Sequence, residues 1–106
     1  MSAQQLQGHK MNYLLSGTWK ELSDKIKWNL KSPRVDLTDE DVLRFAWSTD
    51  SIYAEIEIHE DGSREWFCRN RITSEYFGSS GPEKSELNIE LIKMISIACS
   101  EMVGEE

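Results

Sequence analysis

His59 is the residue whose type most readily suggests chemistry, because an imidazole can act as an acid, a base or a metal ligand near neutral pH. It follows Glu57 by two residues and Glu55 by four. On an extended strand this spacing places the three side chains on one face, where a carboxylate can orient or acidify the imidazole. A hydrolytic or metal site needs more groups, and the sequence has no HxH or HExxH motif. We therefore expect no catalytic residue, no metal and no cofactor, and we interpret His59 as an ordinary histidine at a strand end.

Two other patterns resemble ligand loops only in composition. The acidic run that begins at Asp36 has Asp41 where a calcium loop needs glycine and Trp47 where it needs glutamate. The Gly-Ser-Ser-Gly segment 78–81 lacks the lysine and serine of a phosphate-binding loop. We expect the first to be a connector and the second to be a plain entry to a helix.

The strongest candidate for a functional surface is one face of the predicted sheet. Two large aromatic residues flanked by carboxylates and an arginine are typical of a protein interface. The predicted binding residues are Tyr53, Glu55, Glu57, His59, Phe67 and Arg69. The alternative is that the N-terminal helix or a crossing loop covers this face.

The strand that carries most of these residues is the clearest element in the sequence. Isoleucine and alanine alternate strictly with polar residues over 52–58, which predicts a half-buried strand. A three-residue turn ending in a left-handed Gly62 places Trp66 on the isoleucine face, whereas a two-residue turn would place charged residues there. The three-residue turn also sets Glu57 opposite Glu65, an exposed pair of like charges.

Weaker strand patterns lie on both sides of this hairpin. Alternation over 43–47 predicts a preceding strand, with a helix starting at Thr38 as the alternative. Residues 36–41 are predicted to be an acidic connector, and 74–77 a short fourth strand.

A helix is predicted before the strands. Thr18 and Glu21 have the spacing of a capping box, and the helix should end before Pro33. Its apolar stripe consists of Trp19, Leu22, Ile26 and Leu30.

A second helix is predicted after the strands. Pro82 would lie at its start, and it would run from about Glu83 to Val103 and end at Gly104. Its buried stripe consists of Leu87, Leu91, Met94, Ile95, Ala98 and Met102.

Together these elements predict an α+β fold, with an antiparallel β-meander of about four strands flanked by an N-terminal and a C-terminal amphipathic helix. We expect both helices on one face of the sheet. Residues 1–10 are predicted to be a flexible leader and residues 11–106 a single domain, in which 11–15 either extend the first helix or form a short strand.

Charge limits the choice of partners. The 106 residues carry a net charge of −7, but residues 1–34 have six basic and two acidic residues, whereas 35–106 have six basic and seventeen acidic. Most of the chain should therefore repel nucleic acid and anionic lipid. The sequence has no apolar run long enough to span a membrane and does not start like a secretory signal. Its cysteines, Cys68 and Cys99, are expected to be reduced, so we expect a cytoplasmic protein.

The sequence thus favours a small, acidic, non-enzymatic module that binds another protein with a basic surface and forms a homodimer. An inhibitor of the antitoxin or immunity kind, a phage or plasmid accessory protein and a dedicated chaperone all fit this description. One alternative is a small-molecule binder or minor enzyme with a pocket between sheet and helices, using Trp47, Trp66 and His59. A second is a nucleic-acid-associated regulator that uses Lys20, Lys27, Trp28 and Lys31 of the N-terminal helix.

Overall fold

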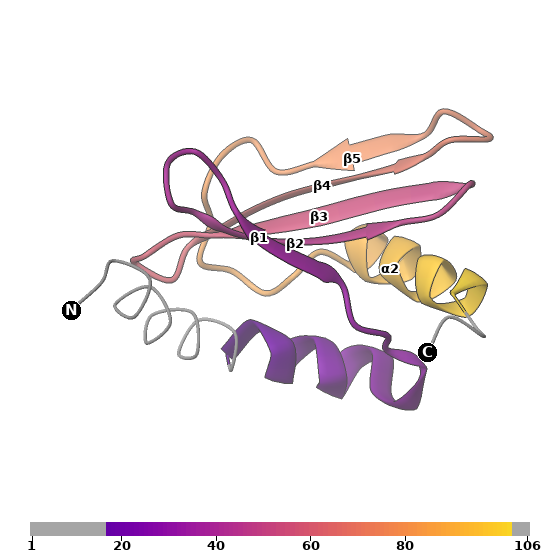
Figure 1. The fold of residues 1–106 in the computed structure, drawn as a ribbon, viewed down its shortest axis with the longest axis horizontal. Helices are drawn as coiled ribbons and strands as arrows, with labels where there is room; N and C mark the ends of the chain where they lie inside the picture. The colour runs from indigo at the N-terminus through magenta and orange to yellow at the C-terminus, as the bar shows by residue number, and fades with distance from the viewer. Residues whose placement is uncertain (1–16, 103–106) are drawn as a thin grey trace.

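The computed structural model describes residues 17–102 of the chain. Within this range, a helix over residues 17–26 is followed by five strands and a second helix. The strands are β1 (Arg34–Leu37), β2 (Leu43–Ser48), β3 (Ile52–Ile58), β4 (Arg64–Asn70) and β5 (Tyr76–Gly78), and the second helix is α2 (Ile89–Glu101). They form one antiparallel sheet in sequence order, and both helices lie on the same side of it (Figure 1). The α+β prediction is confirmed, with five strands in place of about four; the predictions for residues 1–15 lie outside the described residues.

The N-terminal helix packs Trp19, Leu22 and Ile26 of its predicted stripe against the core and ends before Pro33, whereas Leu30 lies beyond the helix and is partly buried. Leu22 and Ile26 are buried, and the Trp19 ring meets the edge of Phe45 with centroids 6.3 Å apart. The helix ends at residue 26 because Lys27 adopts a left-handed backbone conformation with φ 64°. Lys27 is also the first residue of η1 (Lys27–Asn29), a single 3₁₀ turn.

The predicted capping box is wrong. Thr18 lies inside the helix, and the Glu21 carboxylate accepts hydrogen bonds elsewhere. The carboxylate accepts a hydrogen bond of 2.6 Å from the Arg64 guanidinium and one of 2.7 Å from the Leu87 backbone N–H. Glu21 therefore ties the helix to the sheet and to the segment that leads into α2.

The interpretation of residues 36–41 as a connector is wrong for its first two residues. Asp36 and Leu37 belong to β1, which pairs with β2 and places Val35 opposite Phe45. Apolar and charged residues alternate in β1, but the strand has only four residues, and proline precedes it while an acidic turn follows. An edge strand of this length has too few alternating positions to give a clear period.

The strand prediction over 43–47 is confirmed as β2, and the alternative helix from Thr38 is wrong. The Thr38 hydroxyl accepts the backbone N–H groups of Glu40 and Val42, which closes a tight turn between β1 and β2. Asp41 has φ 63° in this turn. A local side-chain bond of this kind competes with helix formation.

The β3–β4 hairpin has the predicted register. Ile56 lies opposite Trp66, and Glu57 lies opposite Glu65. Gly62 takes the left-handed conformation at φ 90°, and the His59 backbone N–H donates to the Ser63 carbonyl at 2.8 Å. The turn therefore fixes which side chains face the helices.

The start of the second helix is predicted too early. Glu83 makes two backbone hydrogen bonds with Arg64 instead, and α2 begins only at Ile89. Its N-cap is Asn88, whose side chain accepts the Glu90 N–H at 2.7 Å. The strand predicted at 74–77 is β5, which starts two residues later than predicted. The predicted end of the second helix, at Val103 and Gly104, lies outside the described residues.

The core lies between the sheet and the two helices. Every residue of the predicted α2 stripe is buried there except Met102, which packs partly buried against the core. The Trp47 indole N–H donates to the Lys31 carbonyl at 3.0 Å, and the Asn29 side chain donates to the Ser96 carbonyl at 3.3 Å. These bonds hold the segment between the first helix and β1 against β2 and α2. Among residues 17–102, no helix is long and apolar enough to cross a membrane.

Candidate functional site

The sheet face opposite the helices holds all of the predicted binding residues. The register places Tyr53, Glu55 and Glu57 of β3 beside Phe67 and Arg69 of β4 on this face. The described part of the N-terminal helix lies on the other side, so it does not cover them (Figure 1). We call this surface the open face.

An aromatic row crosses the open face from β3 to β5. The rings of Tyr53 and Phe67 have centroids 5.4 Å apart, and those of Phe67 and Tyr76 lie 5.8 Å apart in a stacked arrangement. The Arg71 guanidinium lies 5.7 Å from the centre of the Tyr53 ring, within cation–π range. The sequence did not reveal Tyr76 or Arg71 as part of this group. The place of Tyr76 depends on the pairing of β4 with β5, whereas Arg71 is held by hydrogen bonds to Ser51 and Thr49 of the turn between β2 and β3.

Gly78 makes room for this row. It lies opposite Phe67, and a Cβ at this position would come within 3.2 Å of the Phe67 Cβ. The absence of a side chain at Gly78 lets the Tyr76 ring stack on Phe67, as aromatic residues do beside edge glycines in sheets.

Tyr53 is held by its neighbour on the same strand. Its hydroxyl donates to the Glu55 carboxylate at 2.7 Å. Partial burial, together with this hydrogen bond, raises the pKa of Tyr53 to about 12. The phenol therefore stays protonated at neutral pH, and its ring stays fixed against Phe67.

One end of the open face is acidic and includes His59. The His59 Nε2 lies 3.0 Å from the Glu65 Oε1, and ligand atoms of Glu57, His59 and Glu65 all lie within 4.8 Å of one another. Partial burial raises the pKa of Glu57, with further contributions from the charges of Glu55 and Glu65. Sequence analysis placed His59 with Glu55 and Glu57 but missed its contact with Glu65.

Arg44 and Arg69, which both lie on this face, differ in their contacts. Arg44 of β2 makes a two-pronged contact with Asp36 of β1 at 2.8 and 3.1 Å, and this bond lowers the pKa of Asp36. Arg69 is exposed, and within residues 17–102 its side chain forms no hydrogen bond or ion pair. Arg69 is therefore free to meet an acidic group of a partner, whereas Arg44 is already occupied.

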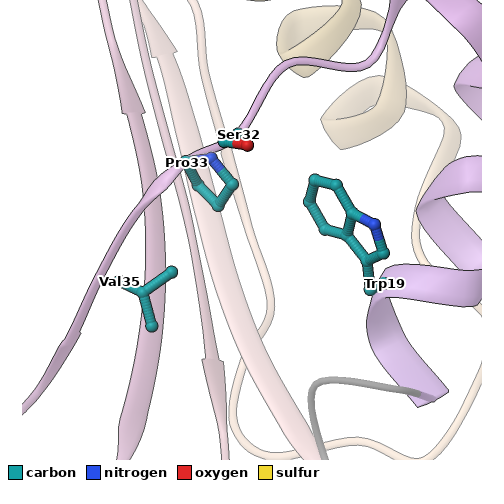
Figure 2. A pocket seen from close by; sticks show the side chains of 4 residues that line it. All are labelled: Trp19, Ser32, Pro33 and Val35. Carbon is teal, nitrogen blue, oxygen red and sulfur yellow. The ribbon is translucent and has the colours of Figure 1, made fainter.

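The pocket expected from Trp47, Trp66 and His59 is not formed by these residues. Both tryptophans are buried on the helix side of the sheet, whereas His59 lies on the open face. A hollow of about 190 Å³ instead lies at the edge near β1, lined by Trp19, Ser32, Pro33 and Val35 (Figure 2). This is smaller than the roughly 300–1,000 Å³ of most ligand pockets.

Both cysteines are buried and unpaired in the core. Burial raises the pKa of Cys68 to about 11 and also raises the pKa of Cys99. The thiolate is the reactive form of cysteine, so neither side chain is suited to nucleophilic chemistry at neutral pH.

The residues of the nucleic-acid alternative do not all lie in the N-terminal helix. Lys20 is in the helix, whereas Lys27 and Trp28 belong to η1 and Lys31 follows it. Trp28 is 90% exposed, as that alternative requires. Lys20, however, pairs with Asp24 at 3.5 Å, and Lys25 pairs with Glu86 at 3.5 Å. These carboxylates reduce the positive charge that the helix presents to a phosphate backbone.

Comparison with known protein families, curated proteins and solved structures finds no match to this chain. The fold alone does not define an activity, because one architecture serves many functions. The function is therefore inferred from the open face.

Proposed function

We propose that this protein is a non-enzymatic interaction module that binds a basic segment of a partner protein on the open face. The observation that carries the proposal is the aromatic row of Tyr53, Phe67 and Tyr76, which none of the described helices covers and which has a group of carboxylates along its side toward the β3–β4 turn.

The aromatic row supports binding of a protein because it offers rigid apolar area at the surface. Tyr53 and Phe67 are half-buried and Tyr76 is 64% exposed. Aromatic side chains lose little conformational entropy on binding and dominate the energetics of many interfaces. A partner side chain laid across the row would remove this area from water.

The carboxylates support a basic partner. Glu55, Glu57 and Glu65 lie along one side of the row, toward the β3–β4 turn, and Arg44, which lies opposite Glu57, is held by Asp36. Lysine or arginine side chains of a partner would relieve the repulsion among these groups. Charge complementarity of this kind speeds association and weakens as salt rises.

Capture from a cell lysate tests the proposal by comparing three forms of the full chain. The wild type is expected to retain a basic protein at low salt and to release it at high salt. The double variant Tyr53→Ala/Phe67→Ala should lose that protein while keeping the wild-type circular dichroism spectrum. The control is Ile72→Ala, which removes an apolar residue that is 77% exposed in the turn after β4 and should leave capture unchanged.

Two outcomes contradict the proposal. One is equal capture by the wild type and the double variant. The other is loss of capture in the Ile72→Ala control, which would move the binding surface to the turn. The open face could instead bind a second copy of this chain. Light scattering after size-exclusion chromatography would then give the mass of a dimer for the wild type and a lower mass for the double variant.

A cytoplasmic location goes with this proposal. Cys68 and Cys99 are free and buried, which suits a reducing compartment. A regulatory role as an inhibitor, an accessory factor or a chaperone would follow from the identity of the captured partner.

A further inference from the structure

Three side chains with metal-binding atoms converge where the β3–β4 hairpin turns. Glu57 and Glu65 face each other across the strands, and His59 lies diagonally opposite Glu65. The His59 Nε2 and the Glu65 Oε1 are 3.0 Å apart, and all three potential ligand atoms lie within 4.8 Å of one another. Two ligand atoms bound to one tetrahedral zinc ion lie about 3.3 Å apart, so small side-chain rotations would bring this set to ligand geometry.

The backbone at this site is held in place by the turn. The His59 N–H donates to the Ser63 carbonyl, and the His59 carbonyl accepts the Gly62 N–H. Asp61 in turn accepts both the backbone N–H and the hydroxyl of Ser63, at 2.9 and 2.6 Å. Ligands on a fixed backbone lose little entropy when an ion binds.

The charge of the site suits a divalent cation. Two carboxylates and a neutral imidazole carry a charge of −2. Within residues 17–102 the Glu57 side chain has no hydrogen bond or ion pair, and Arg44 on the neighbouring strand is held by Asp36. An ion of charge +2 would therefore meet unsatisfied carboxylate charge at a rigid position.

We propose that Glu57, His59 and Glu65 bind one divalent transition-metal ion such as Zn²⁺ and leave a coordination position open. The imidazole favours zinc over magnesium and calcium, which prefer ligand sets made of oxygen alone. This differs from our sequence-based expectation of no metal. The zinc site also goes beyond the proposed interaction function. A single copy of the chain supplies all three ligands, so the ion would bind without a partner protein.

Titration calorimetry with Zn²⁺ and the full chain tests the site without any partner protein. The wild type should bind one ion per chain, and neither Mg²⁺ nor Ca²⁺ should give a comparable signal. His59→Ala and Glu57→Gln should each weaken zinc binding at least about tenfold, since even residues behind the ligands have effects of this size. The matched control is His9→Ala, which removes the other histidine of the sequence and should leave the affinity unchanged.

Three results would overturn the proposal. These are no zinc binding by the wild type, equal binding by the wild type and His59→Ala, and loss of binding in His9→Ala. Circular dichroism of each variant separates loss of a ligand from loss of the fold. As a second measurement, the ring protons of His59 should shift in the NMR spectrum as zinc is added to the wild type, and a shift confined to His9 would count against the site.

Discussion

The two faces of β3 show how differently one strand can be used. Ile52, Ala54, Ile56 and Ile58 point toward the helices and are at most 2% exposed. Tyr53, Glu55 and Glu57 alternate with them and face away from the helices, where they are only half-buried. The first set forms part of the core, whereas no helix among residues 17–102 covers the aromatic area and charge of the second set.

Substitutions at neighbouring positions of β3 give the largest expected contrast between the two faces. Ile56→Ala should lower the free energy of unfolding by about 2–5 kcal/mol, because it leaves a cavity in a close-packed core. Glu55 lies one residue away, on the open face. Glu55→Gln keeps an acceptor for the Tyr53 hydroxyl and should change the free energy of unfolding by no more than about 0.5 kcal/mol. Urea unfolding of both variants measures the difference. Similar losses in the two variants would mean that the open face also supports the fold.

The reactivity of the thiols provides a second test of the covered face. A thiol with a pKa near 11, as for Cys68, carries about a hundredfold less thiolate at neutral pH than an ordinary cysteine. We expect a thiol reagent to modify the native protein at least about a hundredfold more slowly than the protein in denaturant. Absorbance of the released chromophore follows both reactions. Fast modification of the native protein would show that the core beneath α2 opens readily.

Substitution of Glu21 tests how much its contacts with Arg64 and Leu87 contribute to stability on the helix side of the sheet. Glu21→Gln removes the ion pair with Arg64 and weakens the hydrogen bond from the Leu87 N–H, which should cost about 1–3 kcal/mol of stability. The matched control is Glu86→Gln, because Glu86 pairs with Lys25 but its side chain is 83% exposed. Denaturant unfolding should show almost no change for this control. Equal effects of the two variants would contradict a structural role for Glu21.

The contrast between the faces also explains how much of the molecule could be predicted. Alternation in β3 and the glycine of the next turn were enough to fix the hairpin register, because one residue of slip would have buried Glu65 and Arg69. The candidate face followed from that register. Period and turn chemistry therefore carry most of the information about this hairpin.

The missed features depend on contacts between distant segments. The start of α2 at Ile89 is set partly by Glu21, which holds the Leu87 N–H from 66 residues away. The place of Tyr76 in the aromatic row likewise depends on pairing between β4 and β5 and on the space beside Gly78. No local pattern encodes such contacts, so sequence analysis could find the elements but not these groupings.

The pair of Asp36 and Arg44 gives the smallest expected effect and tests whether the open face contributes any stability of its own. The bond to Arg44 lowers the pKa of Asp36 in the folded state, so the ionised carboxylate stabilises the fold. This contribution is present above the unfolded-state pKa of about 3.9 and is lost as the pH falls through the lower folded-state value. Asp36→Asn should therefore reduce the thermal unfolding temperature slightly at pH 7, and its difference from the wild type should shrink as the pH falls below the unfolded-state pKa, while the exposed control Asp50→Asn should match the wild type throughout. The two side chains are 37% and 28% exposed, and solvent screening keeps the effect below that of Glu21→Gln. A loss for Asp36→Asn that does not shrink as the pH falls would show that this residue acts through packing and not through its charge.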